Sequence, residues 1–373
     1  MINISDFYNC LIAEGVDFFT GVPDSYLNEF CKYVLEKCPD NNVIAANEGN
    51  AIAIAAGHYL ATGNIPLVYM QNSGLGNAIN PLLSMCDTTV YGIPLLLLIG
   101  WRGEPGSGDW AQHEKQGILT TIFLDEMGIP YKIITPNDSA DSAIKDLLLK
   151  ARNDKKVVAL IVCKGVFSGK KKNNIGENYE LSRKEAIETI LNTLPEDTFY
   201  AATTGRVTRE LFHLREARKE IKSRDFLNVG AMGHTSSIVL GMAMAKPDKS
   251  FVVLDGDAAA IMHMGSLTMA SKYKLPNYLH IVLNNGAHES VGGQPSAGFM
   301  IDFSRIAEMC GYKTIGHAVS SKEDLIRACK ILMSRDCAGF IEVRIHTGIE
   351  GALPSLKLSH KEALNELVME LSK

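Results

Sequence analysis

The chain has 373 residues, of which 46% are hydrophobic, and a formal net charge of -5 at pH 7. This length favours two α/β domains over a single core, and the charge excludes the strongly basic composition of nucleic-acid-binding proteins. The eight cysteines show no Cys-x-x-Cys spacing, so we expect neither a disulfide framework nor a zinc site. The chain begins without a basic and apolar leader, and its longest apolar run, 94–99, has the length of a strand. We therefore expect a cytoplasmic protein without a membrane span.

Between Asn3 and about Gly165, short apolar runs alternate with helical patterns. The runs lie at 42–45, 67–71, 95–100, 132–135 and 157–163. Continuous apolar strands that alternate with helices predict a parallel sheet covered on both faces. Glu48 lies between the first run and a helix of small residues. On the residues alone, Glu48 either complements the dipole of that helix or has a catalytic role.

A polar stretch, 168–178, separates the two halves of the chain and contains Lys170, Lys171 and Lys172. Three lysines inside a polar segment favour a solvated linker over a binding surface. We predict a first domain over residues 1–167, a linker over 168–180 and a second domain over 181–373.

After Leu181 the alternation of apolar runs and helices resumes. The runs lie at 199–203, 226–229, 251–254, 279–283, 313–315 and 340–345. The fold class is therefore predicted to be α/β, with two open, doubly wound parallel sheets in series. Ligands of such sheets bind at the carboxyl ends of the strands, which is where the glycine-rich segments of both halves fall.

Two polar motifs follow successive strands of the second half. Asp257, in Leu254–Ala258, and Asn285, in Leu283–Gly286, are separated by one helix and one strand, so a βα unit brings them to the same sheet edge. Carboxylate and amide oxygens are ligands that Mg²⁺ accepts, and phosphate oxygens commonly complete its octahedron. The alternative is an aspartate in a turn and a capping asparagine at two strand ends.

Four longer motifs accompany this pattern. They are Gly21–Ser25, Gln112–Gly117, Met232–Ser237 and Asn284–Pro295. Together with Gly256–Asp257 they resemble the motifs of thiamine diphosphate-dependent 2-oxo acid decarboxylases, and among these the phosphonopyruvate decarboxylases. The resemblance implies a pyrimidine-binding domain followed by a pyrophosphate-binding domain, without the middle domain of the larger pyruvate decarboxylases. It also implies thiamine diphosphate and Mg²⁺ as cofactors, and decarboxylation of 3-phosphonopyruvate to phosphonoacetaldehyde.

The resemblance assigns residues to the cofactor by position. Mg²⁺ would be bound by Asp257, the side chain of Asn285 and the carbonyl oxygen of Ala287. Met232 would support the bent shape of the cofactor, whereas the alternative is a buried methionine that fills a core gap. Backbone groups near the diphosphate would come from Gly233, His234, Gly256, Ala258 and Ala259. Ala258 departs from the usual glycine, which costs little if residue 258 has a helical φ.

Three residues are assigned to catalysis by the same resemblance. Glu48 would hydrogen-bond the aminopyrimidine ring and promote deprotonation of the thiazolium carbon. Asp24 and His113 would handle protons. Asp24 could equally cap a helix after its loop, and His113 lies in what we expect to be a polar loop, where a histidine often has no role.

One departure from the family pattern concerns the final proton. Larger decarboxylases place a glutamate six residues after the metal-binding asparagine, where this chain has Val291. The group that delivers the proton after CO₂ has left is therefore open, and Glu289 or His288 would serve only if the helix is displaced.

A phosphonate substrate needs cations or clustered N–H groups. The nearest suppliers are Arg102, Lys115, Ser290, Gly292 and Gly293. The first two share the predicted loop with His113, which favours a role for that loop in substrate binding.

Three other activities fit parts of the pattern. Sulfopyruvate decarboxylase shares cofactor and fold, and the sequence does not exclude it. A nicotinamide-dependent dehydrogenase is disfavoured because no clean Gly-x-Gly-x-x-Gly follows a strand. An inactive regulatory subunit is disfavoured because it would need none of Glu48, Asp257 and Asn285, and the chain has all three.

The resemblance also bears on the binding partners. In this family the two halves of the cofactor are held by different subunits, so we expect a homodimer or higher homo-oligomer with active sites at the subunit interface. The expected partner is a small 2-oxo acid substrate, without nucleic acid and without a membrane.

Overall fold

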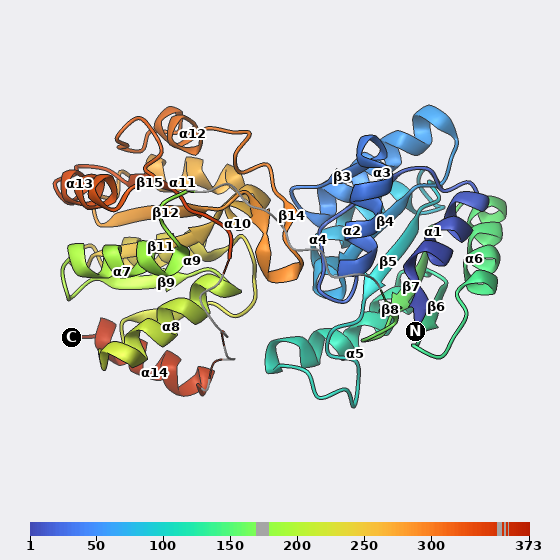
Figure 1. The fold of residues 1–373 in the computed structure, drawn as a ribbon, viewed down its shortest axis with the longest axis horizontal. Coiled ribbons are helices and arrows are strands. Elements are labelled where there is room, and N and C mark those ends of the chain that lie inside the picture. Colours follow the sequence, from blue (N-terminus) through green and yellow to red (C-terminus); the bar gives the residue numbers. More distant parts are fainter. Residues whose placement is uncertain (169–178, 349–352, 354–355, 357) are drawn as a thin grey trace. The chain divides into compact units, whose positions relative to one another are not determined.

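Two parallel β-sheets, one in each half of the chain, form the framework of the protein in a computed structural model (Figure 1). The structure describes residues 1–168, 179–348, 353, 356 and 358–373. One unit contains Met1–Asn173 with Val291–Gln294, and the other contains Asn174–Ser290 with Pro295–Lys373. Among the described residues, no helix has both the length and the apolar character needed to cross a membrane.

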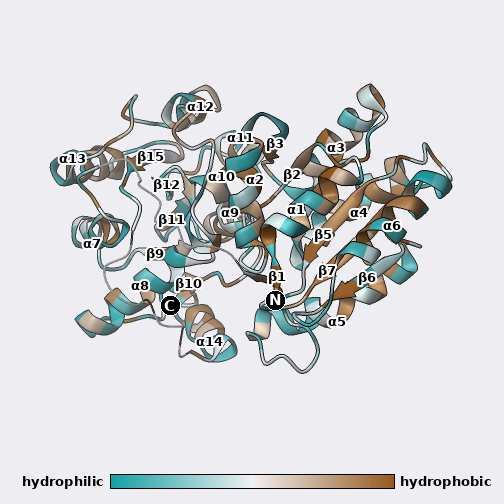
Figure 2. Cartoon of the chain, turned by 45° about the vertical axis from the view of Figure 1, so that its right-hand side comes forward, coloured by the Kyte–Doolittle hydropathy of each residue, from teal (hydrophilic) through white to brown (hydrophobic). Residues whose placement is uncertain are grey.

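The first sheet has six parallel strands. In spatial order they are β3 (Asn42–Ile44), β2 (Phe19–Gly21), β4 (Leu67–Gln71), β5 (Leu96–Gly100), β7 (Val158–Val162) and β6 (Tyr131–Ile134). Every residue of β5 and β7 is buried, as expected for strands covered on both faces, and Figure 2 shows both as strongly hydrophobic. Because the strands are parallel, the carboxyl ends of β2, β3, β4 and β5 meet at one edge.

Six α-helices belong to the first unit among its described residues. They are α1 (Ile4–Ala13), α2 (Asn28–Lys37), α3 (Glu48–Thr62), α4 (Leu75–Pro81), α5 (Ala111–Glu126) and α6 (Asp141–Asp154). A short parallel pair, β1 (Ile2–Asn3) and β8 (Phe167–Ser168), joins the two ends of this segment. Local signals set the ends of α3: the side chain of Asn47 caps its start, and Gly63, with φ 77°, ends it.

The second sheet has five parallel strands. In spatial order they are β10 (Asp225–Leu227), β9 (Phe199–Ala202), β11 (Phe251–Gly256), β12 (Tyr278–Asn284) and β15 (Gly339–Arg344). Adjacent strands β11 and β12 pair in parallel, with Gly256 opposite Leu283. Asp257 and Asn285 therefore leave the sheet at the same edge, as the sequence predicts.

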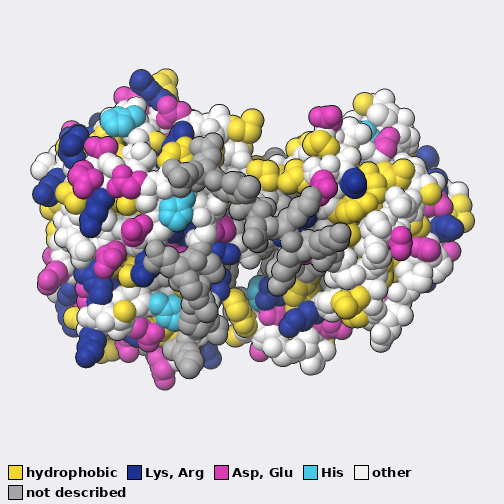
Figure 3. Space-filling model, in the orientation of Figure 1, with side chains coloured by type: hydrophobic (Ala, Val, Ile, Leu, Met, Phe, Trp, Pro, Cys, Tyr) yellow, Lys and Arg dark blue, Asp and Glu magenta, His cyan; other side chains and the backbone are white. Residues whose placement is uncertain are grey.

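Helices of the second unit alternate with these strands. They are α7 (Arg183–Thr193), α8 (Arg206–Arg218), α9 (Thr235–Ala245), α10 (Asp257–Met262), α11 (Leu267–Lys272), α12 (Phe303–Met309), α13 (Lys322–Met333) and α14 (His360–Leu371). A capping box of Ser182 and Glu185 starts α7. Figure 3 shows one face of this unit, on which Lys and Arg side chains are interspersed with Asp and Glu.

The predicted α/β fold class with two parallel sheets is confirmed, and most predicted strands lie within two residues of the observed ones. One predicted strand, 313–315, is wrong: only Lys313 forms an isolated bridge, to Gly339. The observed strand β2 was not predicted. Most of the predicted linker, residues 169–178, lies outside the described residues. Residues 291–294 group with the first unit, although the prediction places them in the second domain.

Candidate active site

Glu48 is a buried carboxylate at the start of α3. It follows the carboxyl end of β3, and only 6% of the residue is exposed. Asn77 donates from Nδ2 to Glu48 Oε2 over 2.7 Å, and a Cβ atom on Gly74 would lie 2.5 Å from Glu48 Cγ. Asn47 already caps the helix, and compensation of a helix dipole requires no burial. The arrangement holds the carboxylate in one direction, which is what a proton-handling group needs.

Asp24 is fully buried in the turn between β2 and α2. Its Oδ2 accepts from the Tyr26 N–H over 2.8 Å, whereas Oδ1 has no hydrogen-bond partner among the described residues. Burial raises the pKa of Asp24, and the Tyr26 hydrogen bond and the charge of Arg102 only partly oppose this. The N-cap residue of α2 is Leu27, so Asp24 holds the turn and does not cap the helix.

The backbone at the end of β5 approaches Asp24 closely. A Cβ atom on Gly100 would lie 2.2 Å from Asp24 Oδ2, so this position admits only glycine while the aspartate keeps its place. The close approach places the carboxyl end of β5, and Arg102 two residues beyond it, next to the turn that follows β2.

Arg102 is largely committed to neighbouring side chains. Its Nε and Nη2 donate to both carboxylate oxygens of Asp109 over 2.6 and 2.7 Å, which holds the pKa of Asp109 well below its usual range. The guanidinium also lies 5.1 Å from the ring centroid of Tyr26 and 5.9 Å from that of Trp110. Its Nη1 donates to Ser25 Oγ over 3.2 Å. The Nη1 side of the guanidinium, which faces Ser25, is the side through which Arg102 could bind a substrate.

His113 and Lys115 both lie on α5, so the prediction that they share a loop with Arg102 is wrong. Good helix formers dominate the segment after Trp110, and they extend the helix through both residues. His113 is half-buried beside Trp110, with ring centroids 6.4 Å apart. Burial and the charge of Arg102 lower the pKa of His113, so its imidazole is neutral at pH 7 and can accept a proton. Lys115 is exposed.

The remaining residues assigned to a phosphonate are divided between the units. Ser290 lies in a 3-10 turn, Glu289–Val291, where its Oγ is 3.6 Å from the position of a Cβ atom on Gly205. Gly292 and Gly293 have φ values of 129° and 77°. A Cβ atom on Gly292 would lie 1.8 Å from Asn28 Oδ1, so only glycine fits there.

Asp257 and Asn285 form the centre of the second half-site. Asp257 begins α10 after β11 and is 2% exposed. Ser296 Oγ donates to its Oδ2, and burial raises the pKa of Asp257 to about 6 although this hydrogen bond opposes the shift. Asn285 follows β12, and its Oδ1 accepts from the N–H of Ala287 over 3.2 Å. All three residues assigned to a metal thus lie at one edge of the second sheet.

The chemistry of this donor set fits a hard divalent cation. Among the described residues, no three or more His, Cys, Asp or Glu side chains gather as they do in a zinc site. An ion at this edge would have one carboxylate together with amide and carbonyl oxygens, a set that suits Mg²⁺ when phosphates complete the shell. The raised pKa of Asp257 means that its neighbours leave the negative charge poorly compensated. A cation would supply that compensation.

Residues expected beside a diphosphate lie on two segments of the same unit. Gly256 ends β11, and Ala258 and Ala259 follow Asp257 in α10, so Ala258 has the helical φ that makes its departure from glycine inexpensive. Gly233 has φ 82°, and a Cβ atom there would lie 2.7 Å from the His263 ring. His234 stacks on His263 with ring centroids 4.2 Å apart.

Met232, beside Gly233, is half-buried. It does not belong to the hydrophobic clusters that the described residues of this unit form. This position gives no support to the interpretation of Met232 as a filler of a core gap.

Glu289 forms a network that the sequence did not reveal. Arg183 donates to Glu289 Oε2 from 106 residues earlier in the chain, and Arg206 Nη1 lies 3.0 Å from Oε1. Asn285 Nδ2 also donates to Oε2 over 3.0 Å, while Arg183 pairs with Glu210 over 3.0 Å. Glu289 is therefore an acceptor that orients the amide of Asn285, and this engagement disfavours it as the source of the final proton.

His288, the other candidate for that proton, lies in β13 (Ala287–His288). Burial lowers the pKa of His288 to about 4. The imidazole is then neutral at pH 7, so His288 has no excess proton to deliver there.

Glu289→Gln is expected to destabilise the protein by about 1.5–3 kcal/mol, the usual contribution of hydrogen bonds to charged groups. Arg206 loses its carboxylate partner, whereas Arg183 keeps Glu210. Denaturant unfolding of the cofactor-free chain measures the change. Glu308→Gln, which removes an exposed ion pair with Arg305, is the control and should cost less than about 1 kcal/mol. Unchanged stability and unchanged Mg²⁺-dependent cofactor affinity with lost turnover would instead support Glu289 as the proton donor.

Two known families match the chain, one in each half. The family described as "Thiamine pyrophosphate enzyme, N-terminal TPP binding domain" matches residues 5–124. Its counterpart, "Thiamine pyrophosphate enzyme, C-terminal TPP binding domain", matches residues 203–343. The first match contains Asp24, Glu48 and His113, and the second contains Asp257 and Asn285.

Two curated relatives match nearly the full length of the chain, and a third matches about half of it. A phosphonopyruvate decarboxylase of Streptomyces viridochromogenes is 30% identical, and the alignment covers 97% of this chain and 93% of the relative. A sulfopyruvate decarboxylase of Methanosarcina acetivorans is 29% identical over 94% of this chain and 92% of the relative. The beta subunit of a sulfopyruvate decarboxylase of Methanothermobacter thermautotrophicus is 31% identical over 51% of this chain and 96% of the relative. The chain therefore belongs to the thiamine diphosphate-dependent decarboxylases, in the group of phosphonopyruvate and sulfopyruvate decarboxylases.

Proposed function

We propose that the protein decarboxylates 3-phosphonopyruvate to phosphonoacetaldehyde and CO₂, with Mg²⁺ bound beside thiamine diphosphate. The observation that carries this proposal is the 30% identity to a phosphonopyruvate decarboxylase over 97% of the chain. It is supported by the buried Glu48 in one unit and the buried Asp257 beside Asn285 in the other. A regulatory subunit without activity would have no need to keep carboxylates in such poorly solvated positions.

Bound thiamine diphosphate would supply the carbon nucleophile that accepts the electron pair left by CO₂. The role proposed for Glu48 is to hold a proton at the aminopyrimidine ring. Asn77 donates to Glu48 Oε2 and so keeps the carboxylate pointing in one direction. The surrounding burial strengthens this hydrogen bond, because little water competes for it.

In the second unit, Asp257, Asn285 Oδ1 and the carbonyl oxygen of Ala287 would hold Mg²⁺. Glu289 contributes by accepting from the amide nitrogen of Asn285, so that the amide oxygen, which also accepts from the Ala287 N–H, is the side-chain atom that would bind a metal. Such a partner behind a metal ligand fixes its orientation.

Asp24 and His113 are proposed to move protons to and from the substrate. Burial raises the pKa of Asp24, so its carboxyl keeps a proton to a higher pH than an ordinary aspartate. His113 is neutral at pH 7 because burial and Arg102 lower its pKa. An acid after β2 and a base on α5, with displaced pKa values, can divide the two proton-transfer roles.

The assembly proposed for this function is a homodimer or a higher homo-oligomer. In it, the pyrimidine-binding half-site of one chain would meet the pyrophosphate-binding half-site of another, with a small 2-oxo acid between them. The relative named as a beta subunit matches about half of this chain, which suggests that in this chain the two half-sites are joined in one polypeptide.

Sulfopyruvate decarboxylation is the second candidate, favoured by the relative from Methanosarcina acetivorans with 29% identity over 94% of the chain. The two substrates differ in the charge that a binding site can distinguish, since a phosphonate can carry a second negative charge. Release of CO₂ from 3-phosphonopyruvate, sulfopyruvate and pyruvate, with and without thiamine diphosphate and Mg²⁺, separates the candidates. A higher kcat/KM for sulfopyruvate would overturn the phosphonate assignment.

Arg102→Met is expected to lower kcat/KM for 3-phosphonopyruvate by about one to two orders of magnitude, the effect of losing a charge-assisted hydrogen bond. The effect on pyruvate should be far smaller, because pyruvate has no second anionic group. Steady-state kinetics with both substrates measures the change in preference.

Two further variants are needed to interpret the change in substrate preference. Arg102→Met with Asp109→Asn removes the ion pair together, so it separates loss of the cation from an unpaired Asp109. Lys115→Met removes an exposed lysine and is expected to change little. An unaltered preference in all three would place the phosphonate elsewhere, such as at backbone N–H groups near Gly292 and Gly293.

A further inference from the structure

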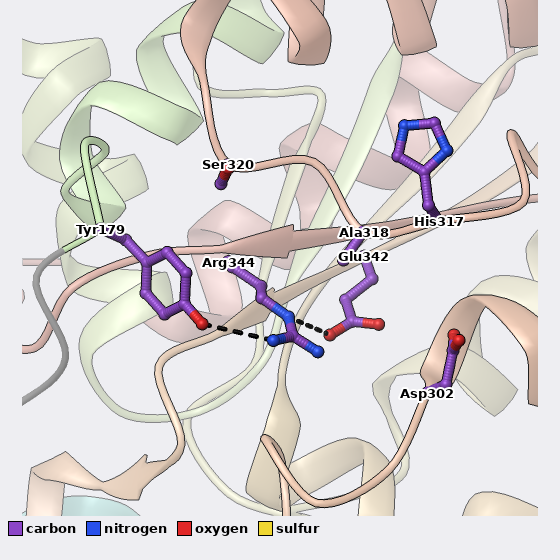
Figure 4. A pocket seen from close by; sticks show the side chains of 7 residues that line it. All are labelled: Tyr179, Asp302, His317, Ala318, Ser320, Glu342 and Arg344. Atoms are coloured by element: carbon purple, nitrogen blue, oxygen red, sulfur yellow. Dashed lines mark hydrogen bonds and ion pairs between the residues drawn. The ribbon is translucent and has the colours of Figure 1, made fainter.

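A cavity lies in the second unit, and none of the described residues that line it is assigned to the cofactor. Its volume is about 390 Å³, and it is lined by Tyr179, Asp302, His317, Ala318, Ser320, Glu342 and Arg344. Figure 4 shows Glu342 and Arg344 on β15, the edge strand of the sheet, with Asp302 and His317 on the opposite side of the carboxyl group of Glu342 from Arg344. Within the cavity, the carboxyl group of Glu342 therefore has Arg344 on one side and Asp302 on the other.

Glu342 is the unusual residue of this cavity. It is completely buried. Its Oε1 accepts from Asn284 Nδ2 over 2.9 Å and lies 3.3 Å from Arg344 Nε. Its Oε2 has no hydrogen-bond partner among the residues that the structure describes, although a buried carboxylate oxygen normally has one. A donor brought by a ligand would satisfy this atom.

Arg344 is fixed for binding an acidic group. Its Nη1 donates to the hydroxyl of Tyr179 over 3.3 Å, and its guanidinium lies 5.7 Å from the ring centroid of Phe299. Tyr179 packs against the same ring, with centroids 5.4 Å apart. A guanidinium already held in place loses little conformational freedom when an anion binds.

We propose that this cavity binds a small zwitterion, with its ammonium group toward Glu342 and Asp302 and its acidic group toward Arg344 and Tyr179. The charges decide the class of ligand. The cavity holds two carboxylates, Glu342 and Asp302, and one guanidinium, so an anion alone would be repelled by the acidic side. A simple amine would give Arg344 no acidic partner beyond Glu342, with which it already pairs. A molecule with both groups engages both sides.

Calorimetric titration of the cofactor-free full chain tests the site without reference to catalysis. The probes are β-alanine, taurine and 2-aminoethylphosphonate, which carry the same ammonium group and differ in the acidic group. At least one is expected to bind with one-to-one stoichiometry. Propionate and propylamine, which keep one charge each, should bind at least roughly tenfold more weakly, since each loses a charge-assisted contact. Absence of binding by all three zwitterions, or equal binding by either single-charge analogue, would refute the proposal.

Two substitutions locate the binding. Arg344→Met removes the proposed partner of the acidic group. Asp302→Asn removes a charge but keeps the side-chain cap that accepts from Arg305 N–H at the start of α12. Both should weaken zwitterion binding by roughly tenfold or more. Arg327→Met, at an exposed arginine of α13 outside the cavity, is the matched control and should bind as the unmodified chain does. Unchanged affinity in Arg344→Met or in Asp302→Asn would place the ligand elsewhere.

Discussion

Glu48→Gln is expected to slow turnover by roughly two to four orders of magnitude, the range that a positioned acid or base contributes, while the fold stays intact. Glutamine has the shape of glutamate and can keep a hydrogen bond with Asn77, which donates to Oε2 over 2.7 Å. An amide cannot take up and hold a proton at the aminopyrimidine ring. Chemistry should therefore fail while most of the cofactor affinity remains.

The exchange of the proton on the thiazolium carbon, followed by NMR with bound cofactor, measures this role directly. It should slow in parallel with turnover. Glu126→Gln, which changes an exposed glutamate at the end of α5, is the matched control and should leave both rates unchanged. If exchange in Glu48→Gln proceeds at the normal rate, Glu48 does not activate the cofactor, and its burial needs another explanation.

The strands that the sequence predicts best are those whose burial is continuous. All five residues of β5 and all five of β7 are buried, so each appears as an unbroken apolar run. Strand β2 has only three residues, and the hydroxyl of its buried Thr20 donates a hydrogen bond to the carbonyl oxygen of Val43. That hydrogen bond joins residues far apart in the sequence, so no local sequence pattern predicts the strand.

The wrong strand at 313–315 has a related cause. β15 pairs with β12 on one side and meets the segment after α12 only through isolated bridges at Lys313 and Val319. The short run at 313–315 contains β-branched Thr314 and Ile315 and has strand propensity, but it lies outside the edge of the sheet, where only single residues pair. Propensity alone does not supply the neighbouring strand that a ladder requires.

Candidate site residues could be predicted where a strand end determines their place. Asp257 and Asn285 follow adjacent parallel strands, and Glu48 follows β3, so topology brings each to an edge. Glu289 and Arg183 meet from 106 residues apart, and no spacing rule connects them. The pairing of Arg102 with Asp109 is local, seven residues apart, yet the turn that joins them depends on three left-handed glycines, Gly103, Gly106 and Gly108.

Asp257→Ala is expected to weaken Mg²⁺-dependent binding of thiamine diphosphate by at least about a hundredfold, because removing one member of a buried charge pair typically costs 3–5 kcal/mol. Asp257 is the buried carboxylate among the three residues assigned to the metal. Its neighbours compensate its charge poorly, so burial raises its pKa to about 6. A bound cation would depend on that charge. Calorimetric titration of the cofactor at saturating Mg²⁺ measures the loss.

The same burial predicts that the variant keeps its fold. In the cofactor-free chain an uncompensated buried carboxylate is a cost, which offsets the hydrogen bonds from Ser296 and from nearby backbone N–H groups that alanine loses. Thermal unfolding without cofactor should therefore change much less than cofactor affinity, and added cofactor should no longer raise the melting temperature. Asp257→Asn keeps a ligand oxygen but not the charge, so it should bind the cofactor with intermediate affinity. Full retention of Mg²⁺-dependent affinity in Asp257→Ala would show that the metal is bound without this carboxylate.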